Sequence, residues 1–294
     1  MHESLGNNIT GPSLIHAPEW IDNPLGAYYL YFGAHKGDYI RLAYADHLEG
    51  PWQIYEPGTL HLEESLFPTT PSTKMLKFGR DPNFKGPDES MPHIASPDVH
   101  IHEETNEIWM YYHGLLKNGL QMTRVARSKD GIHFKAEPDI ISFPYLRIFR
   151  YEEWYYGMCM PGIFYRSRNG INDFKQGPIL FKPTMRHSAL RLVSDQLQIF
   201  WTQVGDSPER ILLSTLDLSK NWKEWKASTP IEILRPEKDW EGGNLEAKPS
   251  FRGLVSEKVC QLRDPAIYEE RGKIFLLYCV AGESGVAIAE LKFA

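Results

Sequence analysis

The sequence predicts an all-β protein, a single five-bladed β-propeller that spans residues 1–294. Three observations predict this fold class. Short runs rich in aromatic and β-branched residues recur along the chain, with turn residues between them. Helical periodicity is almost absent. The runs group into units of a strand with a polar or Pro-containing opening, an aromatic strand, a third strand and a Trp- or Phe-bearing edge strand, which is the pattern of a propeller blade.

The first two predicted blades cover residues 11–56 and 93–138. The first contains the runs GPSLI, AYYLYFG, YIRLAYAD and PWQIY. The second contains HIASPDVHI, EIWMYYHG, MTRVARSKDG and HFKAE, and so repeats the same order of strand types. Within it, Lys129-Asp130-Gly131 is a tight hairpin signal. Each run has the length and composition of a strand.

The remaining blades are predicted at 145–178, 186–227 and 262–293. The third is the shortest, and the fourth ends in WKEWKA at 222–227, which we expect to be its edge strand. The fifth has no obvious fourth strand. We expect residues 1–10 to supply it, because a strand there closes the ring and removes an exposed sheet edge.

Two long connections, 57–92 and 228–259, do not fit the blade pattern. Connections of this length inside a compact domain are usually functional loops, so we expect both to form partial walls of a site. The alternative is that they only decorate the surface.

Composition excludes several classes of function. The net charge is −6 and the basic residues are spread along the chain, which predicts no nucleic-acid partner. The longest apolar runs, such as 274–280, are far shorter than the ~20 residues of a membrane span. The N-terminus lacks a signal-peptide pattern, which predicts a cytoplasmic protein. Three cysteines with no zinc-binding spacing predict buried thiols.

The opening residues of the first strands carry the charges. In a propeller these strands line the central channel, so their openings converge on one mouth. Three openings share a template with proline second, namely GPSL, SPDV and DPAI. The openings bring together two carboxylates, three guanidiniums and two imidazoles: Asp98 and Asp264; Arg147, Arg186 and Arg263; His93 and His187. Such a set is costly to bury unless each charge has a partner.

Two interpretations of the mouth remain open. In one, the charges form a structural plug in which Arg263 pairs with Asp98 and Arg186 with Asp264. In the other, two carboxylates at a wet mouth perform acid/base chemistry, because neighbouring charges push their pKa values apart. Hydrolysis of a sugar linkage needs one protonated and one ionised carboxyl group.

The blade pattern, with SPDV in the second blade, resembles the five-bladed glycosidases of glycoside hydrolase family 43 and its relatives. The resemblance implies an Asp before Pro in the first blade as base, an Asp after Pro in the second as pKa modulator, and a Glu in the third as acid. Asp98 alone matches. Gly11 precedes Pro12 in the first blade, and the third opens with Tyr145-Leu146-Arg147.

Redistributed roles are therefore expected. The Arg263-Asp264-Pro265 string is similar to a site motif of the invertase and levansucrase relatives, and a resemblance to neoagarooligosaccharide hydrolases implies a histidine acid. On this hypothesis Asp98 orients, Asp264 is the base, and His187 or His93 is the acid. The family resemblance also allows a central Ca²⁺ or a water-filled channel; no other cofactor is expected.

The guanidiniums indicate a carbohydrate partner with an acidic group, a uronate or a sulfated sugar, because their forked donors match such groups. They equally well neutralise the local carboxylates. The predicted catalytic residues are Asp98, Asp264, His187 and His93, and the predicted substrate-binding residues are Arg147, Arg186, Arg263, His16, Glu283 and Trp240. Glu283 lies on a hairpin that either reaches the mouth or is solvated, and Trp240 is a candidate to stack on a sugar ring.

No transition-metal site is predicted. His100 and His102 share one strand face, but His93 begins that strand and His113 belongs to the next. Two further hypotheses for the whole protein stand beside a glycosidase-like enzyme. One is a carbohydrate-binding propeller without catalysis. The other is a uronate lyase, in which a histidine removes a proton beside an arginine-neutralised carboxylate.

Overall fold

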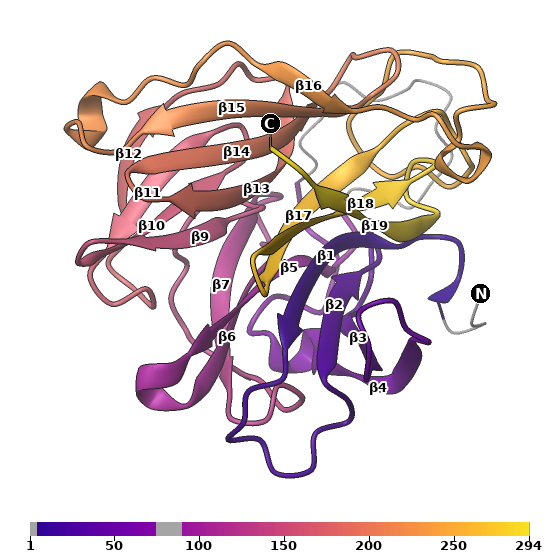
Figure 1. The fold of residues 1–294 in the computed structure, drawn as a ribbon. Helices are drawn as coiled ribbons and strands as arrows, with labels where there is room; N and C mark the ends of the chain where they lie inside the picture. Colours follow the sequence, from indigo (N-terminus) through magenta and orange to yellow (C-terminus); the bar gives the residue numbers. More distant parts are fainter. Residues whose placement is uncertain (1–4, 75–89, 294) are drawn as a thin grey trace.

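In a computed structural model, which describes residues 5–74 and 90–293, the protein is a five-bladed β-propeller (Figure 1). Each blade is an antiparallel sheet whose strands follow one another in chain order. The first two blades consist of β1 (Thr10–His16), β2 (Tyr28–Gly33), β3 (Tyr39–Ala45), β4 (Gln53–His61), β5 (Ile94–His102), β6 (Glu107–Leu115), β7 (Gln121–Ser128) and β8 (Lys135–Ala136). The predicted fold class is confirmed.

The other three blades continue the series around the ring. They consist of β9 (Arg147–Tyr151), β10 (Trp154–Cys159), β11 (Ile163–Ser167), β12 (Lys175–Ile179), β13 (Met185–Val193), β14 (Gln196–Gln203), β15 (Ile211–Asp217), β16 (Ile231–Leu234), β17 (Arg263–Glu270), β18 (Lys273–Val280) and β19 (Gly285–Leu291). Short 3₁₀ turns are η2 (Leu62–Glu64), η3 (Glu103–Thr105), η4 (Trp222–Glu224) and η5 (Asp239–Glu241). Across the described residues, no helix has the length and apolar character needed to cross a membrane.

Two expectations about edge strands are wrong. The fourth blade ends in β16, not in 222–227, because Trp222 and Trp225 turn inward and pack beside Tyr156 and Phe164 of the third blade. The described part of the N-terminal segment adds no strand to the fifth blade, whose sheet contains β17, β18 and β19. Residues 1–4 of that expected strand lie outside the described residues.

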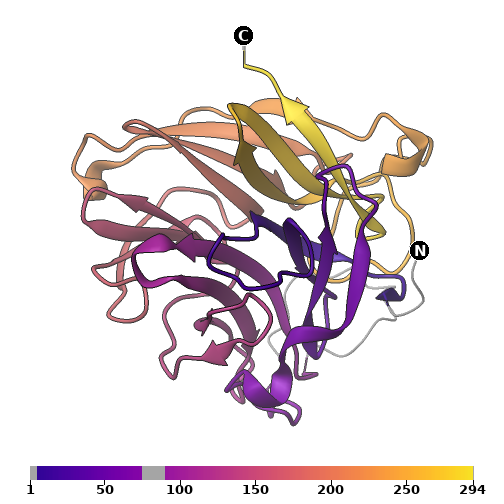
Figure 2. The same cartoon turned by 60° about the horizontal axis from the view of Figure 1, so that its bottom comes forward.

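The ring closes by packing between the last blade and the first (Figures 1 and 2). Leu14 and Tyr28 of the first blade pack against Ala266, Tyr268 and Leu277 of the fifth. In the segment before β1, the Ile9 N–H donates to the Glu283 carbonyl at 2.8 Å. Apolar contacts and hydrogen bonds from the N-terminal segment, rather than a shared strand, therefore close the ring.

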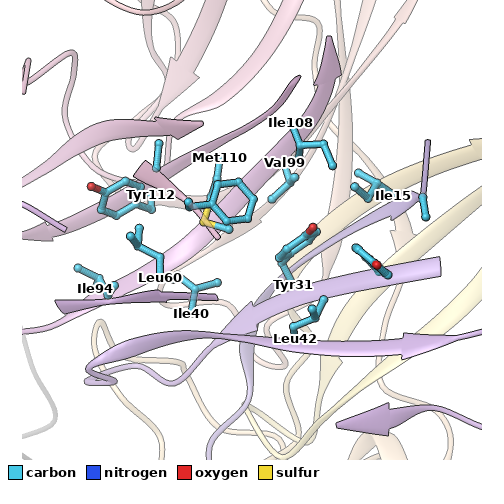
Figure 3. Packing of buried hydrophobic residues seen from close by; sticks show 14 of the residues in the cluster. Ile15, Tyr31, Ile40, Leu42, Leu60, Ile94, Val99, Ile108, Met110 and Tyr112 are labelled. Atoms are coloured by element: carbon cyan, nitrogen blue, oxygen red, sulfur yellow. The ribbon is translucent and has the colours of Figure 1, made fainter. Parts of the chain in front are cut away.

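Aromatic second strands fill the spaces between blades, as in the cluster of the first two blades (Figure 3). Two tyrosines from these strands also make equivalent hydrogen bonds to the next blade. The Tyr31 hydroxyl donates to the Gly131 carbonyl at 2.8 Å, and the Tyr111 hydroxyl donates to the Gly170 carbonyl at 2.9 Å. Both glycines have positive φ in hairpins. The Gly131 turn confirms the hairpin predicted from Lys129-Asp130-Gly131.

The inner strands are linked by side chains at the position after the template proline. The Ser13 hydroxyl accepts the Val99 N–H of the second blade at 2.9 Å. Asp98 Oδ2 accepts the Ile148 N–H of the third at 2.8 Å. The inner strands of neighbouring blades are not paired in one sheet, so these side chains supply acceptors for backbone N–H groups that would otherwise lack them.

The residue before each template proline has a left-handed backbone conformation, which is strained for Ser96 and Asp264 but not for Gly11. Gly11, Ser96 and Asp264 have φ of 61°, 53° and 46°, and the register shifts at each of these positions. Positive φ costs a non-glycine residue of the order of 1–3 kcal/mol, and such strain is concentrated at functional sites. These bulges turn the strand openings into the mouth of the channel.

Candidate functional site

Asp264 lies at the centre of the mouth and is fully buried. Its Oδ2 accepts a hydrogen bond from the Thr10 hydroxyl at 2.8 Å. Its Oδ1 lies 3.5 Å from His187 Nδ1 and has no hydrogen-bond partner within the described part of the chain. Burial raises the pKa of Asp264 to about 6, and the Glu283 carboxylate adds to the rise. The site therefore holds a carboxyl group that titrates near neutral pH.

The surroundings of His187 present more donors than a neutral imidazole can accept. The Asp264 backbone N–H points at Nδ1 from 3.2 Å, and Arg186 Nε points at Nε2 from 3.3 Å. A neutral ring accepts at one nitrogen only. Burial, with the nearby Arg186 and Arg263, holds the pKa of His187 well below its usual range. A role for His187 as a protonated acid near neutral pH is therefore disfavoured.

Arg263 is fully buried and is bound by groups of the protein itself. Its Nη1 donates to Glu283 Oε1 at 2.7 Å and to the Gly253 carbonyl at 3.2 Å. Its Nε and Nη2 both donate to Gln261 Oε1. The expected plug partner, Asp98, is replaced by Glu283, because the hairpin after β18 brings Glu283 beside the start of β17.

Arg186 is also committed to internal partners. Its Nη1 donates to the Phe251 carbonyl at 3.0 Å and lies 3.4 Å from Glu209 Oε2. The expected pair of Arg186 with Asp264 is replaced by Glu209, while the Glu209 Oε1 atom is buried without a hydrogen-bond partner in the described residues. Gly253 and Phe251 both belong to the connection 228–259, so this connection contacts both Arg186 and Arg263.

Glu283 reaches the mouth and is held there by three groups. Besides Arg263, the Asn8 side-chain amide donates to it at 2.6 Å, and His35 Nδ1 lies 3.4 Å away. Burial alone would raise the pKa of Glu283, but His35, Arg263 and Asn8 outweigh it and hold that pKa well below the usual range. Asp264 and Glu283 are thus two neighbouring carboxyl groups whose pKa values are shifted in opposite directions, the first raised and the second lowered.

Rings form a row along one side of the mouth. The ring centroids of His113 and Tyr145 are 4.7 Å apart, those of Tyr145 and His187 are 5.0 Å apart, and those of His93 and His113 are 6.0 Å apart. His93 Nδ1 lies 2.8 Å from the Met91 carbonyl, so that nitrogen carries the hydrogen. His93 therefore lies at one end of the row, and the rings of His113 and Tyr145 separate it from His187.

Asp98 does not join Asp264 at the mouth, although both were predicted catalytic residues. Its Oδ2 is bound to the Ile148 N–H and to His100 Nε2, at 2.8 Å each. Burial raises the pKa of Asp98, but His100, Arg147 and the Ile148 N–H outweigh it and lower the pKa below its ordinary value. Asp98 is thus an ionised group that links two blades.

Arg147, His16 and Trp240 also occupy places other than those expected. Arg147 is buried and donates to the backbone carbonyls of Ser96, Pro97 and Ser188, so it links blades. His16 ends β1, about 20 Å along the strand from Thr10, and so lies at the opposite end of the channel. Trp240 lies on η5 with 56% of its surface exposed.

Sequence reasoning missed Glu209, His35 and Tyr145. Glu209 and His35, like Glu283, lie between the second and third strands of a blade. That shared position was the available signal, because these connections approach the mouth in each blade. Tyr145 opens the third blade, for which the family resemblance implies a glutamate. Its ring, in the row beside His187, and its φ of 60° place it in the site.

The described residues do not fit a central metal ion. They contain no group of three or more His, Cys, Asp or Glu side chains that could hold one. Arginine guanidiniums lie beside Asp264 and Glu283, where a Ca²⁺ would need six to eight oxygen ligands.

Comparisons with known proteins give one sequence relative and many structural ones. No family model matches the sequence. The chain is 34% identical over 310 residues to "Uncharacterized protein R118" of Acanthamoeba polyphaga mimivirus, covering 97% of this chain and 83% of that protein.

The similar solved structures are five-bladed glycosidases, which confirms the fold that the resemblance implied. A thermostable family-43 glycoside hydrolase has a TM-score of 0.63 at 14% identity, covering 98% of this chain and 90% of that one. A Cellvibrio cellulosa α-L-arabinanase complexed with arabinohexaose has a TM-score of 0.58 at 13% identity, covering 98% and 93%. An endo-1,4-β-xylanase from Bacteroides thetaiotaomicron has a TM-score of 0.61 at 12% identity, covering 98% and 91%. At these identities the likeness is one of fold.

Proposed function

We propose that this chain, which belongs to the same family as the mimivirus protein, is a glycoside hydrolase-like enzyme that acts on a carbohydrate at the mouth of the propeller. The observation that carries this proposal is Asp264, a carboxyl group with a pKa of about 6 and one oxygen without a hydrogen-bond partner among the described residues. The shared fold of family-43 glycosidases supports it.

In the proposed reaction Asp264 is the general acid, in place of the role as base expected from the sequence. A carboxyl group with a raised pKa stays protonated at mildly acidic pH and gives its proton to the leaving oxygen of a glycosidic bond. Glu209 is the proposed second carboxyl group, because its Oε2 lies against the guanidiniums of Arg186 and Arg263 while its Oε1 lacks a hydrogen-bond partner in the described chain. Ionised Glu283 holds Arg263 in place and favours the protonated form of Asp264.

The substrate is proposed to be a sugar without an acidic group. Arg147, Arg186 and Arg263 were the reason to expect a uronate or a sulfated sugar, and each of them binds carbonyls or carboxylates of the protein. The same contacts weigh against a uronate lyase, which would need a free guanidinium to neutralise the substrate carboxylate. Because Asp264 and Glu209 are buried, the proposal requires the mouth to open when substrate enters.

A carbohydrate-binding propeller without catalysis is the second candidate. Two observations favour it. Asp264 and Glu209 are completely buried. Gly11 stands where the family resemblance implies the catalytic base, and a Cβ there would lie 2.8 Å from Ser96 Cα. A side chain at that position would need the neighbouring blade to move. The two candidates differ in whether product forms.

The deciding experiment incubates the protein with xylotriose, arabinohexaose and aryl glycosides and measures released sugar for the wild type, Asp264→Asn and Glu209→Gln. We expect wild-type turnover that falls as the pH rises above about 6, as Asp264 loses its proton, and a loss of about 10²–10⁴-fold in Asp264→Asn. Glu246→Gln, at an exposed pair with Lys248, is the matched control.

Full activity of Asp264→Asn would overturn the assignment of the acid. If no protein releases sugar while a saccharide raises the melting temperature of the wild type, the propeller is a binding module and the enzymatic proposal is wrong.

A further inference from the structure

A cavity lies away from the mouth, along the later halves of β1, β5, β13 and β17 and the start of β9. It has a volume of about 570 Å³, in the range of small-molecule sites, and every blade contributes to its wall. We call it the rear cavity, and its polar lining residues include His16, Asp98, His100, Arg191, Glu269 and Glu270. Asp264, Glu209 and Glu283 do not line it, so it is distinct from the proposed active site.

Two imidazoles on its wall have fixed tautomers. His100 Nε2 lies 2.8 Å from the ionised Asp98 carboxylate, and His16 Nδ1 lies 3.0 Å from the Ala17 carbonyl. A carboxylate and a carbonyl only accept, so these nitrogens carry the hydrogens. In the neutral form of each ring the other nitrogen, Nδ1 of His100 or Nε2 of His16, is then an acceptor.

Among the carboxylates and guanidiniums of the lining, the carboxylates are in excess. The carboxylates of Asp98, Glu269 and Glu270 outnumber the guanidiniums of Arg147 and Arg191. Both guanidiniums are already engaged, because Arg147 donates to three backbone carbonyls and Arg191 donates to Glu269 and to Gln198. The rear cavity therefore offers acceptors and negative charge, and a ligand must bring the donors.

The rest of the wall is aliphatic. It includes the side chains of Ile101, Ile148, Leu190, Leu192 and Ile267, whereas Tyr268 is the aromatic ring among them besides the two imidazoles. A saccharide would find little aromatic surface for stacking. A methylene chain matches this wall.

We propose that the rear cavity binds a small aliphatic amine. Its ammonium group donates to the acceptors formed by His100, Glu269 and their neighbours, and its methylene groups lie on the aliphatic side chains. The positive charge offsets the excess carboxylate, which is the reason to prefer an amine over a neutral diol of the same length. This proposal does not depend on glycosidase activity at the mouth.

The test is calorimetric titration with 1,4-diaminobutane, with 1,4-butanediol as the matched uncharged probe. We expect the diamine to bind and the diol to bind at least roughly tenfold more weakly. Glu269→Gln and His100→Leu should each weaken diamine binding by about tenfold, while Asp264→Asn should leave it unchanged. The His100 ring signals should shift in the NMR spectrum when the diamine is added.

Four results would each overturn the proposal, and three of them concern the rear cavity itself. They are a lack of diamine binding up to about 10 mM, equal affinity for the diol, and affinity that survives both rear-cavity variants. Loss of binding in Asp264→Asn would also overturn it, since it would place the diamine at the mouth. Glu269 is 46% exposed, so its variant keeps the test valid if His100→Leu does not fold.

Discussion

Asp98 of the second blade accepts the backbone N–H of Ile148 in the third blade at 2.8 Å. Ser13, at the same position of the first blade, accepts the N–H of Val99 in the second at 2.9 Å. The two bonds are repeats of one device, in which the residue after the template proline links its inner strand to the next. The carboxylate of the SPDV motif is therefore part of the ring's framework, and it is also part of the rear cavity.

Asp98→Ala should destabilise the protein by about 2–3 kcal/mol, because it leaves the buried Ile148 N–H without an acceptor. Asp98→Asn keeps an acceptor oxygen and should cost less. Urea unfolding measures both values, and hydrogen exchange at the Ile148 amide should be faster in the alanine variant. If the two variants are equally stable, Asp98 does not act through this bond.

Asp264→Asn should stabilise the protein at neutral pH. The pKa of Asp264 is about 6 in the folded protein against an ordinary 3.8, so the folded state binds this proton more tightly than the unfolded chain. Stability from this group is present below about pH 3.8 and is lost as the pH rises through 6. The variant removes this loss, which amounts to about 3 kcal/mol at pH 7 or above.

The measurement compares urea unfolding of Asp264→Asn and of the wild type from pH 4 to pH 8. We expect the difference in unfolding free energy to grow across this range in favour of the variant. A constant difference would mean that Asp264 has no raised pKa, and it would remove the support for its role as an acid.

Glu283→Gln should destabilise the protein by about 3–5 kcal/mol, because it removes the carboxylate that the fully buried Arg263 contacts at 2.7 Å and leaves it only the looser contact with Glu209 at 3.7 Å. The control is Glu246→Gln, which breaks an exposed pair with Lys248 and should change stability by less than about 0.5 kcal/mol. Thermal unfolding at pH 7 compares them. Equal effects would show that the buried pair is dispensable.

Gly11→Ala should be more destabilising than Gly6→Ala. Both glycines have positive φ, 61° and 57°, so the backbone cost of alanine, about 1–2 kcal/mol, is common to both. A Cβ at Gly6 meets nothing within 4 Å, whereas a Cβ at Gly11 would lie 2.8 Å from Ser96 Cα. Overpacking should add about 1–3 kcal/mol at Gly11, as measured by urea unfolding. Equal costs would mean that the neighbouring blade yields easily.

Much of the fold followed from local patterns. Strand-length aromatic runs and turn residues predicted five blades, and the Gly131 hairpin formed as expected. The edge of the fourth blade was misassigned because Trp222 and Trp225 resemble strand residues, whereas the gain from burying their rings between blades turns this segment inward. That gain depends on a partner surface that the local sequence does not contain.

The sequence alone determined which residues open the inner strands, and so it placed Asp264, Arg186, Arg263 and His187 at one mouth. Tertiary structure decided how these charges pair. Arg263 pairs with Glu283 and Arg186 pairs with Glu209, because the connections between second and third strands bring those carboxylates to the mouth. Strand periodicity fixes the direction of a side chain within a blade, but a charge pairs with the nearest group in space, and that distance depends on loops from other blades.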